Sequence, residues 1–324
     1  MTAPARARGY HAGAALGRPE AEARFPWLRA VDWPRVAALF PVRLLRGYLG
    51  GASSPADPRV LTAMPSNDEL RDDPGDVADP VGEQGRSPLP WVVRKHDDRV
   101  LLLLTKRCHL YCRYCFRRDH VPGEGEDPTA AEWGDMLHYA KHSGARELIL
   151  SGGDPLAVTD ARLFAAIDAV RPEVPVVRLH TRAPITFPQR VTSALVAGLR
   201  RRAPVWVLVH ANHPVELSSP VREALARLVD AGLPVLNQSV LLRGVNDSAS
   251  TLAELCEALV ELRVFPYYLH HPDAAPGNAA FRLGLAEGWA IYEELRGKLS
   301  GIALPQYVID PPDGSGKRPV SDML

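Results

Sequence analysis

From residue 91 onward, short runs of Val, Leu and Ile alternate with longer stretches in which apolar residues recur at helical spacing. This pattern predicts β-strands followed by amphipathic helices. The predicted strands are 100–105, 147–150, 176–180, 205–210, 235–240 and 264–269. The predicted helices between them are 129–142, 160–170, 189–201, 219–232 and 250–262. Six strand–helix units in succession indicate an α/β protein with a parallel sheet.

Two architectures fit six such units, an open doubly wound sheet and a barrel or partial barrel. Polar segments follow nearly every predicted strand: "SGGDP", "HTRAP", "HANHP", "NQSV" and "HHPD". In a barrel, the carboxyl ends of all strands meet at one mouth, where loops build the functional site. The pattern therefore favours a TIM-like partial (β/α)6 barrel, with six units rather than eight.

The remaining chain divides by composition. Residues 1–25 are rich in Ala, Arg and Gly and are predicted to be disordered. Residues 26–90 begin with short helical patterns and continue with a stretch rich in Pro, Gly, Asp and Ser, which predicts a helical to irregular N-terminal region. Residues 91–310 form the predicted core, and residues 311–324 a C-terminal segment.

Charge narrows the class of partner. Lys plus Arg and Asp plus Glu both number 38, so the formal net charge is zero. A neutral chain has no bulk attraction to nucleic acid or to an anionic membrane, which points to a small-molecule partner. No apolar run approaches the roughly 20 residues of a membrane span, and the N-terminus lacks a signal-peptide core. We expect a cytoplasmic protein.

Three of the four cysteines lie within eight residues, directly after the first predicted strand. Cys108, Cys112 and Cys115 have the spacing C-x3-C-x2-C. A structural zinc ion usually takes four ligands, so His109 or His120 would have to complete a zinc site. Three cysteines on a four-iron cluster instead leave one iron open to a ligand.

The fourth cysteine, Cys256, lies in a helical pattern and is predicted to be inert core.

The cysteine loop and several other segments together resemble the lysine 2,3-aminomutase family of radical S-adenosylmethionine (SAM) enzymes. The resemblance covers roughly residues 79–320. The segments are "DPVGE", "LLLLTKRCHLYCRYCFRR", "SGGDPL", "HTRAPITFPQR", "HANHP", "LPVLNQSVLLRGVND", "PYYLHHPD" and "PPDGSGKRPV". It implies a radical SAM partial barrel, a [4Fe-4S] cluster held by the three cysteines, SAM, pyridoxal 5'-phosphate (PLP), and a reductant of the flavodoxin or ferredoxin type.

The resemblance also implies which residues bind SAM. Gly152, Gly153 and Asp154 match the family segment that holds the methionyl part of the cofactor. His210 and Gln238 match positions on the adenosyl side. Considered alone, a Gly-Gly turn or a histidine at a strand end is equally typical of a structural role.

Lys317 lies in the Gly-rich segment "PPDGSGKRPV". The segment is not a Walker A loop, because its first glycine is missing and Arg318 follows the lysine. Without the other segments, Lys317 would be interpreted as a mobile surface lysine. The resemblance implies that Lys317 forms an imine with PLP, and that Arg99 is a weaker candidate for the coenzyme phosphate.

Three charged residues match the family's substrate contacts. The resemblance assigns Arg117 to the substrate α-carboxylate, and Asp273 and Asp310 to the distant ammonium of lysine. Either aspartate alone would be interpreted as a turn or cap residue, but together they favour a cationic side chain. The predicted activity is interconversion of L-lysine and β-lysine.

Alternatives remain: an aminomutase acting on glutamate or arginine, the β-lysine-forming enzyme of the elongation factor P pathway, or a metal-binding scaffold without catalysis. The elongation factor P relative generally lacks the second aspartate, which here is Asp310. Ser248 stands where the longer aminomutases carry a zinc-binding cysteine, so no structural zinc is predicted. A homo-oligomer is possible, but the sequence does not indicate its size.

Overall fold

A computed structural model describes residues 15–118 and 125–324. Its centre is an open nine-stranded sheet in the order β11-β10-β9-β8-β7-β6-β5-β4-β3. Seven neighbouring strands are parallel: β4 (Arg99–Leu103), β5 (Glu147–Ser151), β6 (Val176–His180), β7 (Val205–Val209), β8 (Val235–Val240), β9 (Phe265–His270) and β10 (Gln306–Ile309). The edge strands β3 (Val92–His96) and β11 (Arg318–Pro319) are antiparallel to their neighbours.

The predicted α/β class and its six strand–helix units are confirmed. The barrel is partial, because β3 and β11 form the two edges of the sheet and do not pair with each other. Three strands of this sheet were not predicted: β3, β10 and the two-residue β11. The four-residue strand β10 is too short to show a period, and β3 ends in Arg94, Lys95 and His96. Lys95 and His96 line a cavity instead of the core, so they interrupt the apolar pattern.

Several helices begin at residues whose side chains cap them. Thr129, Thr159, Thr192 and Ser248 each accept a hydrogen bond from the backbone N–H three residues later, which satisfies one unpaired donor of the first turn. The helices are α1 (Arg18–Arg24), α2 (Trp33–Leu39), α3 (Pro58–Ala63), α4 (Ala130–His142), α5 (Asp160–Val170), α6 (Ala183–Thr186), α7 (Ser193–Arg200), α8 (Ser219–Asp230), α9 (Ala249–Glu261) and α10 (Leu285–Lys298). The helix predicted over 189–201 begins later, because Pro188–Arg190 forms a separate 3-10 turn.

Strand β6 shows how the sequence separates core from site. Val177 and Leu179 are buried in the core, whereas Arg178 and His180 line the cavity. Alternate side chains of a strand point to opposite faces, so β6 contributes one set of side chains to the core and the other to the cavity. Cys256 is buried in α9 as expected, and burial raises the pKa of its thiol to about 12.

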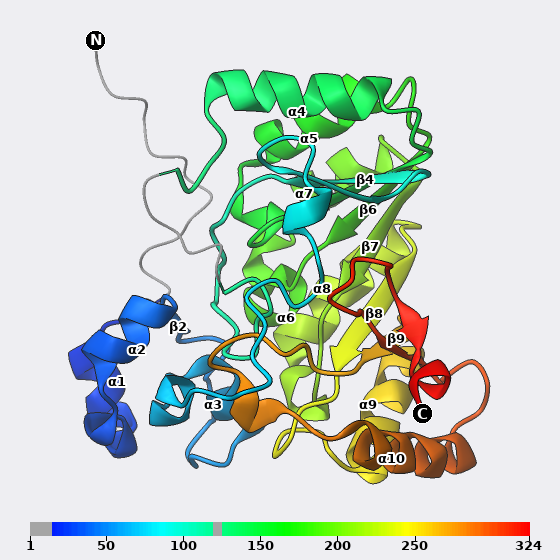
Figure 1. The fold of residues 1–324 in the computed structure, drawn as a ribbon. Helices are drawn as coiled ribbons and strands as arrows, with labels where there is room; N and C mark the ends of the chain where they lie inside the picture. The colour runs from blue at the N-terminus through cyan, green and yellow to red at the C-terminus, as the bar shows by residue number, and fades with distance from the viewer. Residues whose placement is uncertain (1–14, 119–124) are drawn as a thin grey trace.

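The N-terminal region differs in part from the prediction. Disorder was expected for residues 1–25, yet β1 (Ala15–Leu16) pairs with β2 (Leu44–Leu45) and α1 follows it. Phe25 is buried in the main core, which supplies the apolar contact that orders this segment. Residues 1–14 lie outside the described part of the chain. In Figure 1 the blue helices α1 and α2 lie on the side of the molecule away from the red C-terminal segment.

Within residues 15–118 and 125–324, no helix has both the length and the apolar character that crossing a bilayer would require.

Candidate active site

One cavity of about 430 Å³ lies at the carboxyl ends of the parallel strands. Every residue that the sequence assigned to the cluster, the cofactors or the substrate lines it: Arg99, Cys108, Cys112, Cys115, Arg117, Gly152, Gly153, Asp154, His210, Gln238, Asp273, Asp310 and Lys317. The cavity therefore collects residues from the whole length of the sheet, as a partial barrel requires.

The cysteine loop follows β4 and is fixed by an arginine between the second and third cysteines. Arg113 is 1% exposed as a side chain and pairs with Glu69 through Nε at 3.0 Å and Nη2 at 2.5 Å. Arg118 donates to the same carboxylate at 2.5 Å. A buried carboxylate shared by two guanidinium groups is charge-compensated. The N-terminal region thereby holds the loop in place.

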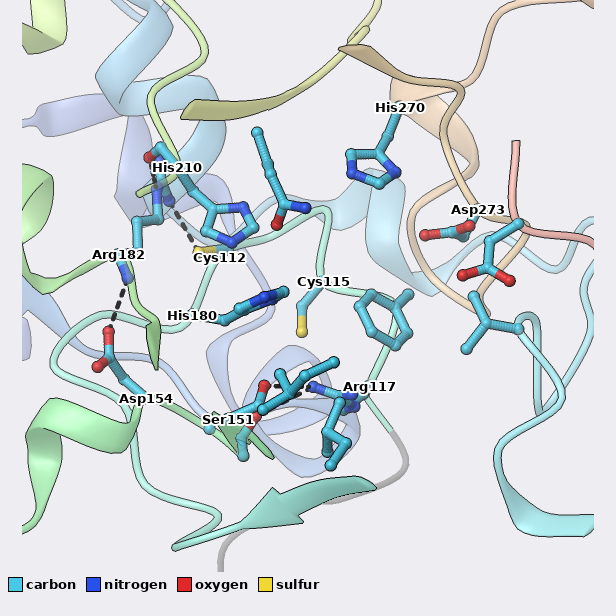
Figure 2. Close-up of a pocket in the computed structure, with 18 of the residues that line it drawn as sticks. Cys112, Cys115, Arg117, Ser151, Asp154, His180, Arg182, His210, His270 and Asp273 are labelled. Atoms are coloured by element: carbon cyan, nitrogen blue, oxygen red, sulfur yellow. Dashed lines mark hydrogen bonds between the residues drawn. The ribbon is translucent and has the colours of Figure 1, made fainter. Parts of the chain in front are cut away.

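Burial disfavours ionisation of two of the three cysteine thiols. Burial raises the pKa of Cys108 well above its usual value and that of Cys115 to about 11. Such thiolates form when a metal supplies the positive charge. Arg182 also donates from Nη1 to Cys112 Sγ at 2.8 Å (Figure 2).

Three thiols on one short loop fit an iron–sulfur cluster. Among the described residues, no three His, Cys, Asp or Glu side chains converge closely enough to hold a single ion. In a four-iron cluster each cysteine binds a different iron, so such convergence is not needed. His109 stacks on Phe187, and its Nε2 lies 3.2 Å from the Leu156 carbonyl oxygen. The other candidate zinc ligand, His120, lies outside the described residues.

The two glycines after β5 pack against the chain itself. Gly152 has φ +130°, and a Cβ there would lie 2.3 Å from the Thr105 carbonyl oxygen. A Cβ at Gly153 would lie 2.4 Å from the Arg107 carbonyl oxygen. The packing of the chain itself therefore requires both glycines, and their contact with SAM stays a prediction. They let the "SGGDP" turn lie against the start of the cysteine loop.

Asp154 accepts hydrogen bonds from the chain itself. Its carboxylate accepts from Leu156 N at 2.8 Å, Thr181 Oγ1 at 2.7 Å and Arg182 N at 2.9 Å. These bonds hold the turn after β6, which carries the guanidinium bonded to Cys112. Contact of Asp154 with SAM stays a prediction.

Three histidines line the middle of the cavity: His180, His210 and His270. Burial lowers the pKa of all three, that of His210 to about 4. They are therefore neutral at pH 7 and can accept as well as donate hydrogen bonds. Gln238 of β8 lines the same cavity.

Lys317 supplies the primary amine that PLP attachment requires. Its Nζ lies 3.3 Å from Asp310 Oδ2. The segment that carries Lys317 continues into the edge strand β11, which pairs with β10. Gly316 precedes it with φ +88°, and a Cβ there would lie 2.6 Å from the His96 ring. A glycine is thus needed for the loop to carry Lys317 into the cavity.

Two guanidinium groups fit a coenzyme phosphate. The Nε atoms of Arg99 and Arg178 are buried, and Arg99 Nε lies 3.2 Å from Asp98 Oδ1. Arg178 also pairs with Glu147 at 2.8 Å. Buried N–H donors of this kind match phosphate oxygens. Arg178 was not predicted, although a charged residue in the middle of the alternating strand β6 was a usable signal.

The predicted substrate residues are paired with side chains that the sequence analysis did not single out. Arg117 binds Glu83 through Nε at 2.7 Å and Nη2 at 2.6 Å, and its Nη1 donates to Ser151 Oγ at 3.2 Å. Lys95 lies 2.8 Å from Asp310 Oδ1.

Asp273 lies near these charges. Burial, with a smaller contribution from Asp310, raises its pKa to about 7. In Figure 2, Asp273 lies well apart from Asp154 and Arg182, with Cys115 and Arg117 between them.

The comparisons agree with this geometry. The family model of the Radical SAM superfamily matches residues 102–256. The L-lysine 2,3-aminomutase of Clostridium subterminale is 42% identical over 83% of this chain and 65% of its own length. A Treponema pallidum protein provisionally given the same name is 43% identical over 76% of this chain and 70% of its own. The glutamate 2,3-aminomutase of Clostridioides difficile is 34% identical over 82% of this chain and 63% of its own length.

The chain spans about 65% of the length of the first of these relatives. Of the Treponema protein it covers more than two thirds, at an identity well above what chance similarity gives. The match to residues 102–256 includes the cysteine loop and part of the cavity lining, among it Asp154 and His210. This chain belongs to the lysine 2,3-aminomutase family of radical SAM proteins.

Proposed function

We propose that the protein is an isomerase that interconverts L-lysine and β-lysine. One observation carries the choice of substrate: Asp273 and Asp310 line the same cavity as the cysteine loop and Lys317. An ammonium group at that end gains two charge-assisted hydrogen bonds. A glutamate side chain would place a third carboxylate beside these two and would have to compete with Asp310 for Lys95 and Lys317, which is unfavourable.

Different residues of the chain would bind the cluster, the coenzyme and the substrate. Cys108, Cys112 and Cys115 would hold the cluster, and Lys317 would hold PLP. When bound, the cluster with SAM supplies a carbon-centred radical that abstracts hydrogen, and PLP supplies a π-system across which nitrogen shifts between neighbouring carbons. Arg117 orients the α-carboxylate.

The test is an anaerobic assay of the iron- and sulfide-reconstituted protein with SAM, PLP and a flavodoxin- or ferredoxin-type reductant. Lysine, glutamate, arginine and norleucine are offered separately. We expect β-lysine from lysine and little product from the other three. Turnover of glutamate in preference to lysine would contradict the substrate assignment and leave the family unaffected.

Replacing Asp310 by Asn should weaken lysine turnover selectively. The change removes a charge-assisted hydrogen bond to the ammonium, on the order of 1.5–3 kcal/mol in kcat/KM. Norleucine has no side-chain ammonium, so its turnover should fall little. The preference for lysine over norleucine should therefore fall by about the same amount. Steady-state kinetics of both substrates measures this. Equal losses for lysine and norleucine would show that Asp310 does not contact the ammonium.

Lysine binding should depend on pH through Asp273, whose pKa is raised to about 7 by burial, with Asp310 and Glu83 adding to the rise and Lys317 and Lys95 opposing it. Below pH 7 most of the Asp273 carboxyl is protonated, and it must lose its proton before it can pair with a cation. The KM for lysine should therefore rise up to tenfold for each pH unit below 7, and level off above.

The control is Asp273→Asn, which cannot titrate. Its KM for lysine should be high and flat between pH 5.5 and 8.5. A pH profile identical to that of the wild type would assign the titration to another group.

A further inference from the structure

Glu83 holds the guanidinium of Arg117 in a fixed plane. Its Oε2 accepts from Nε at 2.7 Å and its Oε1 from Nη2 at 2.6 Å, and the two side chains are 9% and 13% exposed. The backbone N–H of Glu83 donates to Asp79 Oδ1 at 2.9 Å, which fixes the segment itself. A bidentate, largely buried pair of this kind restrains both position and orientation.

The residue two before Glu83 reaches the other end of the cavity. The carbonyl oxygen of Val81 accepts from Lys95 Nζ at 2.5 Å, and the same Nζ lies 2.8 Å from Asp310 Oδ1. Lys95 is 11% exposed and Asp310 14% exposed as side chains. The position of this aspartate therefore depends on the backbone of the segment that also holds Arg117.

Gly82, between Val81 and Glu83, touches the loop that carries Lys317. Gly82 has φ +66°, and a Cβ there would lie 2.6 Å from the backbone nitrogen of Gly314. Segment 81–83 and the loop pack backbone to backbone, so neither can shift without the other. Three consecutive residues thus contact three parts of the cavity wall.

We propose that segment 81–83 sets the separation between the two charged ends of the substrate cavity, with Glu83 orienting Arg117 and Val81 orienting Lys95 and Asp310. The inference rests on the proposed function, since it takes Arg117 as the carboxylate site and Asp310 as part of the ammonium site. These are positioning residues. They select the length of the amino acid, because both of its ends must be bound while its α-nitrogen is held at the coenzyme.

The test compares Glu83→Gln and Glu83→Asp with wild type on ornithine, lysine and homolysine, which differ by one methylene each. Glu83→Gln loses the charge that clamps Arg117, so the KM for lysine should rise about tenfold or more while kcat changes less. Glu83→Asp keeps the charge but moves the guanidinium by about one methylene. It should lower the preference for lysine over at least one homologue by about tenfold.

Two measurements separate positioning from damage. PLP content and borohydride labelling of Lys317 should equal wild type in both variants, and binding of the three amino acids can be followed by the absorbance of the coenzyme without turnover. The matched control is Asp168→Asn, which breaks a bidentate pair with Arg202 on the outside of the protein. It should leave the length preference unchanged.

The outcomes are distinguishable. If wild type neither binds nor rearranges lysine, the proposed function is wrong. The positioning inference alone is wrong in two cases, both with a wild type that prefers lysine. In the first, the Glu83 variants lose activity on ornithine, lysine and homolysine in equal proportion. In the second, they retain the wild-type KM. Should Glu83→Gln fail to fold, Glu83→Asp carries the test, because it keeps the ion pair.

Discussion

Alanine at any one of Cys108, Cys112 and Cys115 will abolish reductive cleavage of SAM, whereas Cys256→Ala will leave it intact. The three loop cysteines line the cavity, and loss of one thiolate leaves an iron without its ligand. Cys256 is buried in α9 and belongs to no such group. Release of 5'-deoxyadenosine by the reconstituted, anaerobically reduced protein measures the effect.

Iron and acid-labile sulfide provide the control for that experiment. Wild type and Cys256→Ala should bind both, and the three loop variants should bind much less. Wild-type cleavage by any loop variant would overturn the cluster assignment. Stoichiometric zinc without sulfide in the wild type would instead support a metal-binding scaffold.

Replacing Lys317 by Ala will remove covalently bound PLP and reduce rearrangement below detection. The amine is the only part of this side chain that can form a covalent bond with the coenzyme aldehyde. Wild-type protein treated with PLP and borohydride should carry the label on the peptide that contains Lys317.

The cavity offers a matched control, because Lys95 also reaches Asp310, at 2.8 Å. Lys95→Met should retain the label on Lys317. Label on Lys95 in the wild type, or label that persists in Lys317→Ala, would show that the Gly-rich segment does not hold the coenzyme.

The sequence predicted those features that depend on local patterns. Alternating apolar runs located the six strands between residues 100 and 270, because each strand buries one face against helices. The spacing of Cys108, Cys112 and Cys115 predicted their common site, because one short loop must keep them together. The resemblance then supplied Lys317 and the two aspartates, which the fold brings into one cavity.

Local sequence patterns could not predict the ion pairs that line the cavity. Glu83 and Arg117 are 34 residues apart, and Lys95 and Asp310 are 215 apart. Each pair depends on how separate segments pack, which no local period encodes. The same holds for Gly152, whose role depends on the backbone of a neighbouring strand end.

The central claim is an intramolecular nitrogen shift in lysine, and L-lysine labelled with 15N at the α-nitrogen tests it most directly. The reconstituted protein is incubated anaerobically with this substrate, SAM, PLP and reductant, and the product is analysed by NMR and mass spectrometry. The proposed function predicts β-lysine with 15N bonded to C3 and no loss of label to ammonia. Cleavage of SAM without β-lysine, or β-lysine that has lost the label, would contradict it.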